Sequence, residues 1–492
     1  MSTKPIRRTT RRFLLSAAIT AVYLISSKAS AQTASLELRV LPDSHRVAIE
    51  LTAAPAASWS FVDSYAGIVG LGRRVERFAA FDEGGSEVPV TQTAPGQFQS
   101  AKTAKRVRYE INLGPVSRGA NFSMLSWLDQ ERGVLMLSDL VPVSAGSNSG
   151  QELKIHFQLP QSWGVVSGEP KVSEDDFAIK DVSRSVFAVG TNLRASQTSL
   201  SGITLDFVTN GDWAFSDADV VQLAQQVLKA HRETFGSFPG KTATFILFPF
   251  PLAVSASRWS AETRGTTVTL IMGKLPSRVA ALAQLSTPVT HEFFHFWIPN
   301  ALTLSGNYDW FYEGFTTYEA AQTAIRLGLL TFPEFLNSIA RAYDSSKSET
   351  DLSLIEASNR RFTGGLNSVY AKSQVVAFIC DLGLRSRSKK SLGDVYRKLL
   401  STSKSDSARA NNSDGNRVVT TMLSQETGSE EFVRLFIQNP VSINLASELA
   451  PFGLKVDGAG VRTQISVAEK LNKQQRDLLR DLGYNAATHA TR

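Results

Sequence analysis

Residues 290–300 read THEFFHFWIPN, a stretch that holds two of the six histidines of the chain and a glutamate directly after the first of them. In an α-helix, side chains four positions apart lie on the same face, so His291 and His295 are expected to converge. Two converging imidazoles can share one divalent cation, and zinc–nitrogen bonds of about 2.0–2.1 Å suit their spacing. Glu292 would project beside them, where a carboxylate can take a proton from water. The stretch therefore predicts a zinc centre on a helix.

The same residues allow a second interpretation, an aromatic core helix whose histidines only make hydrogen bonds. The helix itself is expected to have Thr287 as its cap and Pro288 in its first turn, and to end before Pro299. Phe and Trp residues between and after the two histidines would pack against the core in either case. A third metal ligand elsewhere in the sequence would favour the zinc centre over the core helix.

Such a ligand is available in YDWFYEGFTTY, residues 308–318. Glu313 lies 18 positions after the second histidine, one turn into a second helix that Asp309 could cap. Two histidines and a carboxylate are one of the usual protein ligand sets of catalytic zinc. Asp309 is also a candidate for orienting the metal ligands, and Gly314 is expected to mark close approach to the first helix. A surface carboxylate is the alternative for Glu313.

The first 31 residues differ in composition from the rest of the chain. Five basic residues up to Arg12 precede the apolar run FLLSAAITAVYLI, and the small-residue triplet ASA ends at residue 31. This order is typical of a cleavable export signal, and its apolar run is shorter than the about 20 residues that a membrane-spanning helix needs. The "TRRFLL" at residues 10–15 resembles a twin-arginine signal. The sequence therefore predicts a periplasmic or secreted protein without a membrane span in its mature form.

This leader also accounts for the net charge of +7, because it holds six of the 52 basic residues and none of the 45 acidic ones. The remaining chain would be nearly neutral, which argues against nucleic-acid partners and polybasic membrane binding. The single cysteine, Cys380, excludes an intramolecular disulfide, so stability has to come from packing.

Local patterns predict an α+β fold. Runs such as RVAIELTA, RVRYEINL and ELKIHFQL alternate apolar and polar residues and are separated by turn residues, as in a β-sandwich or saddle. An amphipathic helix is expected at residues 216–236, with His231 near its end as a surface residue or as a complement to the helix dipole. Two further strands follow it, and helices dominate after residue 288.

Two blocks resemble the gluzincin metallopeptidases. HEFFHFW, residues 291–297, followed by WFYEGFTTY, residues 310–318, is similar to the glycyl aminopeptidase family and, more distantly, to the aminopeptidase N family. The resemblance extends over roughly residues 236–456 and implies a thermolysin-like zincin domain with Zn²⁺ as cofactor. Only 34 residues follow residue 458, so the PDZ domain of glycyl aminopeptidases is not expected.

The same resemblance implies two further site residues. VYAKSQVVAFICDLGLR, residues 369–385, is similar to the tyrosine helix of the family, in which Tyr370 would hydrogen-bond the developing oxyanion. RWSAETRGTTVTLI, residues 258–271, stands where the family carries a glutamate for the substrate amino group. Glu262 matches that glutamate, although the preceding glycines of the family are absent here. A carboxylate on an edge strand without substrate contact is the alternative for Glu262.

Four regions are predicted: a signal peptide at 1–31, a β domain at 32–205, a zincin catalytic domain at 206–400 and a helical region at 401–492. The expected function is that of an exported zinc metallopeptidase acting on peptides or proteins, most simply an aminopeptidase, with Glu292 as general base. The altered strand around Glu262 leaves a zinc endopeptidase or oligopeptidase open. A catalytically silent peptide-binding protein with a zincin fold is the alternative from another class.

Overall fold

The computed structural model describes residues 34–115, 121–144, 152–200, 202–302, 304–349, 351–405, 413–458 and 462–485. These residues belong to one compact unit, Thr33–Arg492. The export signal predicted at residues 1–31 lies outside the described residues. Within the described ranges, no helix combines the length and the apolar character that crossing a membrane requires.

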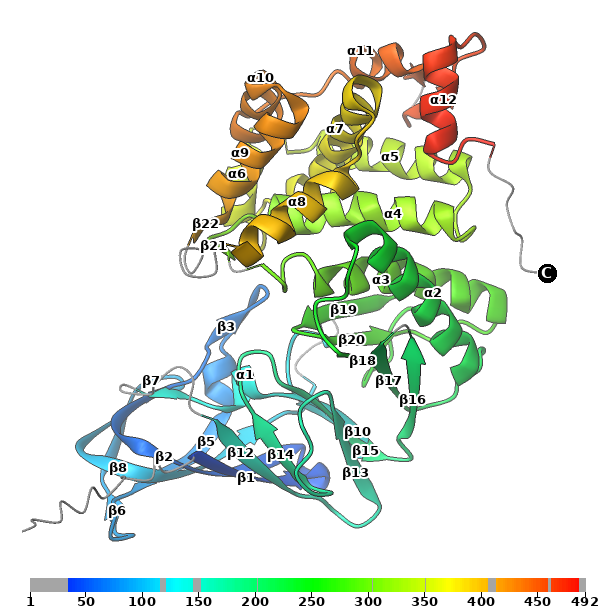
Figure 1. Cartoon of the computed structure of the whole chain (residues 1–492). Helices are drawn as coiled ribbons and strands as arrows, with labels where there is room; N and C mark the ends of the chain where they lie inside the picture. Colours follow the sequence, from blue (N-terminus) through cyan, green and yellow to red (C-terminus); the bar gives the residue numbers. More distant parts are fainter. Residues whose placement is uncertain are drawn as a thin grey trace, which may run out of the picture. The chain divides into compact units, whose positions relative to one another are not determined.

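Alternating apolar residues build the first sheet. In β1 (Ala34–Leu41) every second residue is buried, so one face of the strand faces the core and the other faces solvent. β1 pairs with β2 (Arg46–Ser60), and β2 pairs with β8 (Gln97–Asn112), within a nine-stranded sheet. Figure 1 shows these strands in blue and cyan.

A second sheet of four strands covers the buried face of the first. Its two central strands are β10 (Arg132–Met136) and β15 (Val186–Thr191), with β9 (Trp127–Leu128) and β13 (Trp163–Ser167) at its edges. Both faces of this sheet are buried: Leu135 belongs to the core shared with the nine-stranded sheet, whereas Val134 packs against strands further along the chain. The predicted N-terminal β-sandwich is therefore present, and its second sheet is a middle layer.

The third sheet contains Glu262, one of the predicted site residues, on one of its edge strands. It has the order β16 (Arg194–Leu200), β17 (Ile203–Thr209), β18 (Thr242–Pro249), β20 (Thr267–Met272) and β19 (Trp259–Arg264). Successive residues of β18 serve two cores, because Phe245 packs with helices and Ile246 with the second sheet. This explains its unbroken apolar sequence. The predicted boundary at residue 205 falls inside β17, and the domain boundaries stay predictions.

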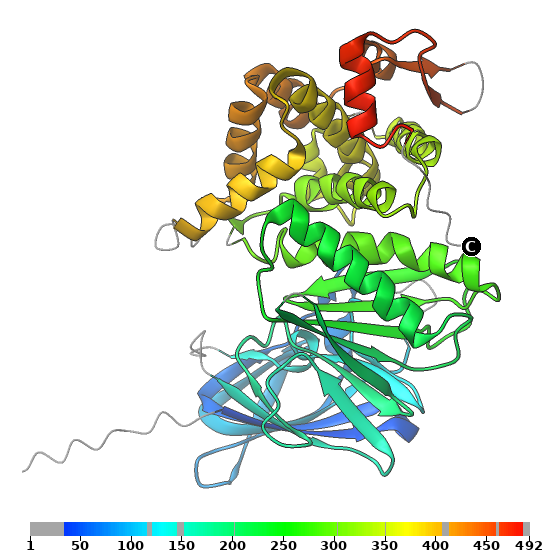
Figure 2. The same cartoon turned by 45° about the vertical axis from the view of Figure 1, so that its right-hand side comes forward.

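Helices α2 (Asp217–Phe235) and α3 (Arg278–Glu292) cover one face of this sheet (Figure 2). The prediction that the histidine-bearing helix begins after Thr287 is wrong, since Ser277 caps α3 and accepts a hydrogen bond from the amide of Ala280. Pro288 lies inside the helix. The apolar residues before and after it are buried at helical spacing, so packing of this stripe outweighs the backbone hydrogen bond that proline removes.

The surface position predicted for His231 is also wrong. His231 continues the buried stripe of Val220 and Val227 on α2 and is 0% exposed. Its Nε2 donates a hydrogen bond of 2.9 Å to the carbonyl oxygen of Thr290, while its buried Nδ1 has no hydrogen-bond partner among the described residues. Burial lowers the pKa of His231 to about 3. The neutral ring thus supports the backbone just before His291.

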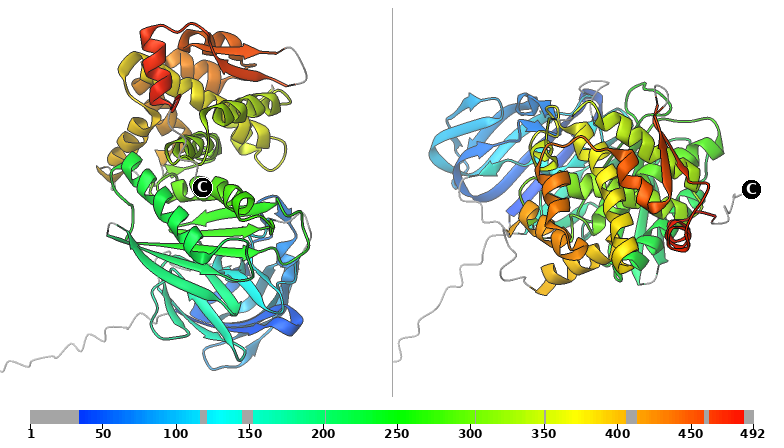
Figure 3. Two further views of the ribbon diagram at one scale, coloured as in Figure 1. Left: turned by 90° about the vertical axis from the view of Figure 1, so that its right-hand side faces the viewer. Right: turned by 90° about the horizontal axis from the view of Figure 1, so that it is seen from above.

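The C-terminal part is helical. Helix α7 (Ser373–Ser388) is buried along most of its length and is surrounded by other helices. Figure 3 shows these helices, in light green to red, from two further sides. Among them are α4 (Thr316–Arg326), α5 (Phe332–Ser346) and α12 (Lys473–Asp481). The predicted α+β class, with N-terminal strands and C-terminal helices, is confirmed.

His231 makes the stability of the fold depend on pH. Its pKa is lower in the folded chain than in the unfolded chain, so the stability from its neutral form is complete above about pH 6.5 and is lost as pH falls toward 3. The free energy of unfolding should decrease by up to about 1.4 kcal/mol per pH unit from this group. His231→Gln keeps a donor for Thr290 but cannot titrate, so urea unfolding between pH 7 and 4 should show a shallower loss. Equal slopes for the two proteins would contradict this assignment.

Candidate metal centre and active site

The end of α3 brings two imidazoles together. The Nε2 atoms of His291 and His295 are 3.1 Å apart, although His295 belongs to a 3-10 turn (Phe293–Phe296) that follows the α-helix. The Nδ1 atom of His295 donates a hydrogen bond of 2.8 Å to the carbonyl oxygen of Ile298. In a neutral ring this leaves Nε2 without a proton and free to bind a cation. The convergence predicted from the spacing is present.

The third side chain comes from a π-helical turn, η4 (Trp310–Phe315). The Oε2 atom of Glu313 lies 3.1 Å from Nε2 of His291 and 3.5 Å from Nε2 of His295. Single π-helical turns are found frequently at functional sites, because the wider turn redirects a side chain. The structure therefore gathers the three residues predicted as metal ligands around one point.

This donor set fits a zinc ion. Zinc bonds of about 2.0–2.1 Å in a tetrahedral site require donor atoms about 3.3–3.4 Å apart. The three observed separations of 3.1, 3.1 and 3.5 Å lie close to that value. Glu292 and the two histidines also offer donor atoms within 4.8 Å of one another. We assign Glu313 and not Glu292 as the third ligand, because its oxygen is closer to both rings.

Buried charges favour a cation at this point. Burial acts to raise the pKa of the Glu313 carboxyl, but Arg361 and His295 lower that pKa well below its usual range. Burial acts to lower the pKa of His295, but the carboxylates of Glu313 and Glu292 raise it to about 9. Glu313 is therefore ionised at neutral pH, as a metal ligand has to be.

Glu292 is held beside the ligands by the neighbouring sheet. Its side chain is only 6% exposed and lines the cavity. Its Oε2 atom accepts a hydrogen bond of 2.7 Å from Thr263, which follows Glu262 on β19. This hydroxyl orients the carboxylate without neutralising it. A fixed carboxylate next to a metal centre has the geometry of a general base.

Tyr370 lies on a second π-helical turn, η5 (Ser368–Lys372), directly before α7. Its ring centre is 6.4 Å from that of His291, and its side chain lines the same cavity. Burial raises the pKa of the phenol well above its usual value. The hydroxyl therefore keeps its proton at neutral pH and can act as a hydrogen-bond donor.

The two π-helical turns meet at Gly314. A Cβ atom on Gly314 would lie 2.2 Å from Cβ of Ser373 and 2.5 Å from the carbonyl oxygen of Val369. The close approach predicted from this glycine therefore exists, but with the segment of Tyr370 and not with the helix of His291. Glycine brings the third ligand and the tyrosine into one site.

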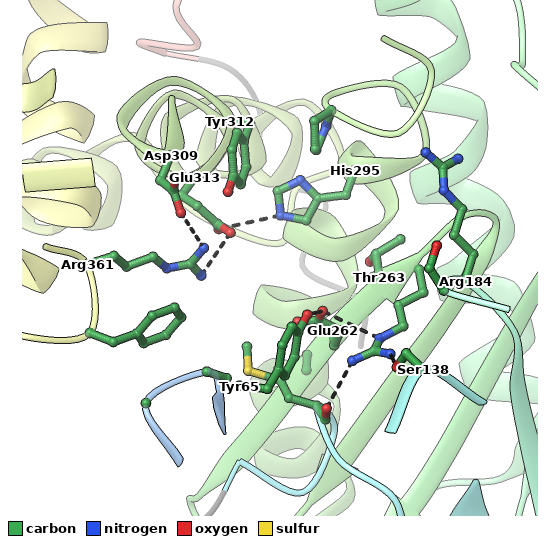
Figure 4. A pocket seen from close by; sticks show the side chains of 18 of the residues that line it. Tyr65, Ser138, Arg184, Glu262, Thr263, His295, Asp309, Tyr312, Glu313 and Arg361 are labelled. Atoms are coloured by element: carbon green, nitrogen blue, oxygen red, sulfur yellow. Dashed lines mark hydrogen bonds and ion pairs between the residues drawn. The ribbon is translucent and has the colours of Figure 1, made fainter. Parts of the chain in front are cut away.

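Asp309 has a different role from the predicted helix cap. Its backbone is helical, and its side chain makes no capping hydrogen bond. Its Oδ1 atom instead pairs with Nη1 of Arg361 at 2.9 Å, and Nη2 of the same arginine lies 2.9 Å from Oε1 of Glu313 (Figure 4). Sequence reasoning missed Arg361, because it follows α6 (Leu354–Asn359) in a loop without motif or spacing signal.

Glu262 lines the same cavity as Glu292, but its carboxylate already has partners within the protein. The hydroxyl of Tyr65, from β3 (Ser64–Tyr65), donates a hydrogen bond of 2.9 Å to Oε1 of Glu262, and Nε of Arg264 is 3.7 Å from the same oxygen (Figure 4). Burial raises the pKa of Glu262, and Arg264 opposes that shift. Tyr65 was not predicted as a site residue, since 197 positions separate it from Glu262.

These groups share a cavity of about 910 Å³. Its polar wall includes Glu262, Glu292, His295, Glu313 and Tyr370. The lining also includes Tyr65 and Val69, from the hairpin of β3 and β4 (Ile68–Val69), and Phe362, from the loop before η5, which are 39%, 79% and 48% exposed.

Comparison with known families finds a match in the N-terminal part. Residues 64–186 match the Peptidase M61 N-terminal domain. No curated protein sequence matches the chain significantly.

Solved structures match almost the whole chain. A protein of the aminopeptidase N family from Idiomarina loihiensis superposes with a TM-score of 0.75 at 18% identity, over 90% of this chain and 82% of that one. A mutant M1 zinc metallopeptidase from Deinococcus radiodurans gives a TM-score of 0.56 at 13% identity, over 84% and 95% of the two chains. The chain has the fold of a gluzincin-type peptidase.

The resemblance to gluzincin peptidases seen in the sequence is thereby confirmed. The M61 match lies in the β domain, whereas HEFFHFW and WFYEGFTTY lie in the zincin part, so different regions point to the same kind of fold. In this gluzincin fold His295, Glu313, Glu292 and Tyr370 line one cavity, and Nε2 of His291 lies 3.1 Å from Nε2 of His295.

Two matched substitutions test the ligand assignment. Loss of a group that only orients a metal ligand weakens metal binding by about 10–100-fold. Glu313→Gln removes a charged ligand itself, so it should weaken zinc binding by more than that. Glu292→Gln should leave the affinity within a few-fold of the parent. Competition with a chromophoric chelator measures both. A larger loss for Glu292→Gln than for Glu313→Gln would reverse the assignment.

Proposed function

We propose that this chain is a zinc metallopeptidase that hydrolyses peptide bonds, and that it acts as an aminopeptidase. The observation that carries the proposal is the triangle of donor atoms on His291, His295 and Glu313, with sides of 3.1–3.5 Å, next to a buried glutamate. A catalytically silent peptide-binding protein would need neither Glu292 nor Tyr370 in its cavity.

His291, His295 and Glu313 would hold the zinc. When bound, zinc acts as a Lewis acid and lowers the pKa of a water molecule to about 7. Glu292 accepts the proton of the attacking water on the carboxylate that Thr263 orients, and then delivers it to the leaving amine. Tyr370 donates its phenolic hydrogen bond to the oxygen that becomes negatively charged on the substrate carbonyl. These steps need no side-chain nucleophile.

Aminopeptidase action rests on Glu262. It lines the cavity that also contains Glu292, so a substrate whose scissile bond lies at Glu292 could place its terminal ammonium group near a second carboxylate. The relatives support this direction: one belongs to the aminopeptidase N family, and the Deinococcus radiodurans mutant was also crystallised with a Tyr-Ser-Ala substrate, at a TM-score of 0.54.

A specific observation favours the alternative of endopeptidase action. Tyr65 occupies one oxygen of Glu262, and the charge of Arg264 lies 3.7 Å from it, so this carboxylate attracts an ammonium group less than a free one would. Peptides without a free amino group could then also bind. The substrate termini that are accepted separate the two functions.

We also propose export to the periplasm or outside the cell, on the leader-like composition of residues 1–31.

Glu292→Gln tests the chemistry. The amide cannot accept the proton of water, so kcat for peptide hydrolysis should fall by about 10²–10⁴ while the zinc content stays that of the parent. Hydrolysis of a fluorogenic peptide, combined with metal analysis, measures both. A variant as active as the parent would refute the assigned base.

Glu262→Gln tests the choice of substrate. Loss of a charged hydrogen-bond partner should raise KM for aminoacyl substrates by about tenfold or more, and leave N-acetylated peptides as poor substrates as before. Initial rates with paired free and acetylated peptides give the comparison, and Trp259→Phe, on the same strand, is the matched control. Efficient cleavage of acetylated peptides that does not depend on Glu262 would identify an endopeptidase.

A further inference from the structure

Arg361 connects two parts of the site. Its Nη1 atom binds Asp309 at 2.9 Å, and its Nη2 atom lies 2.9 Å from Oε1 of Glu313. The same Nη2 atom donates a hydrogen bond to the hydroxyl of Tyr370. The guanidinium group also lies over the rings of Phe362 and Tyr370, with distances of 5.0 and 5.2 Å to their centres. One planar cation thus contacts both the third ligand and the tyrosine.

The contact of Arg361 with Glu313 gives the two carboxylate oxygens different roles. Oε2 faces the imidazoles at 3.1 and 3.5 Å, and Oε1 faces Arg361 at 2.9 Å. A carboxylate held in this way offers a single oxygen to a metal. Without the arginine, the group could rotate about its terminal bond and present both oxygens or neither.

Its contact with Tyr370 determines the direction of the phenolic proton. Arginine has only donors, so the tyrosine oxygen has to accept from Nη2. The single hydroxyl proton of Tyr370 cannot point toward Arg361 and is left for the side of the cavity and Glu313. An oxyanion donor needs this arrangement, because its proton must be available at the moment when charge develops.

Arg361 makes these contacts while one of its own hydrogen-bond donors stays unsatisfied. Its Nε atom is buried and has no hydrogen-bond partner in the part of the chain that the structure describes, whereas the terminal nitrogens contact Asp309, Glu313 and Tyr370. Leaving a buried donor unsatisfied costs about 1–3 kcal/mol. Such a cost is expected where a side chain serves a functional geometry.

We propose that Arg361 is a positioning residue for the peptidase reaction: it orients Glu313 toward the metal and the Tyr370 proton toward the substrate. The inference rests on the proposed function and adds to it a residue that acts through two others.

Zinc affinity tests the first contact without any substrate. Arg361→Gln should weaken zinc binding by about 10–100-fold, as loss of a group that orients a ligand does. Arg361→Lys should restore only part of the affinity, because one ammonium group cannot reproduce the planar fork. Arg360→Gln, at the exposed neighbouring position, should bind zinc like the parent. Thermal unfolding of each protein shows whether it is folded.

A double-mutant cycle tests the second contact. At saturating zinc, Arg361→Gln should lower kcat by about 10–100-fold with KM changed less than about threefold, since the lost contact acts in the transition state. In a Tyr370→Phe background the same substitution should cost at least about fivefold less, because the hydroxyl that it positions is already absent.

The outcomes are distinct. Zinc affinity of folded Arg361→Gln within about twofold of the parent would overturn the role toward Glu313, since about 10–100-fold is expected. An equal loss of kcat in both backgrounds would overturn the role toward Tyr370. A parent that binds zinc but cleaves no peptide would refute the proposed function instead, and the zinc measurements would still decide the first role.

Discussion

The site depends on the buried carboxylate of Glu313, whose two oxygens have different partners. One oxygen lies within 3.5 Å of both imidazole nitrogens, and the other lies 2.9 Å from a guanidinium group. A buried carboxylate is costly unless it is paired and hydrogen-bonded, so this group needs cations on both sides. Arg361 supplies one of them, and the geometry of the donor atoms suits a metal ion as the other.

The backbone around Glu313 is adapted to this arrangement. Glu313 and Tyr370 both lie on π-helical turns, η4 and η5, which touch at Gly314. The missing Cβ atom lets the two turns approach closely enough for one arginine to reach both side chains. Behind the other ligands, the neutral ring of His231 supports the backbone at Thr290. The candidate metal site thus lies where several buried segments leave little freedom, as preorganised sites require.

The β domain contributes to the cavity as well as to the fold. Tyr65 reaches across from the hairpin of β3 and β4 (Ile68–Val69) and binds Glu262 on the edge strand of the third sheet. The same hairpin packs near the loop of Arg361, since a Cβ atom on Gly67 would lie 3.5 Å from Cβ of Phe362. The cavity is therefore lined by groups from the N-terminal strands as well as from the part of the chain that follows them.

Local sequence determined the parts of this protein whose partners are close along the chain or follow a strict period. Backbone geometry alone predicts the strand alternation, the convergence of His291 and His295, and the position of Glu292 beside them. The motif that contains Glu313 supplied the third predicted ligand. Tertiary structure decided the rest. The start of α3 depended on packing across Pro288, and His231 became buried because its helix face met α3. Arg361, in a loop, and Tyr65, in the short strand β3, have no signal other than their position in space. Long-range contacts of this kind leave no periodicity in the sequence, because the energy that selects them arises only when distant segments pack together.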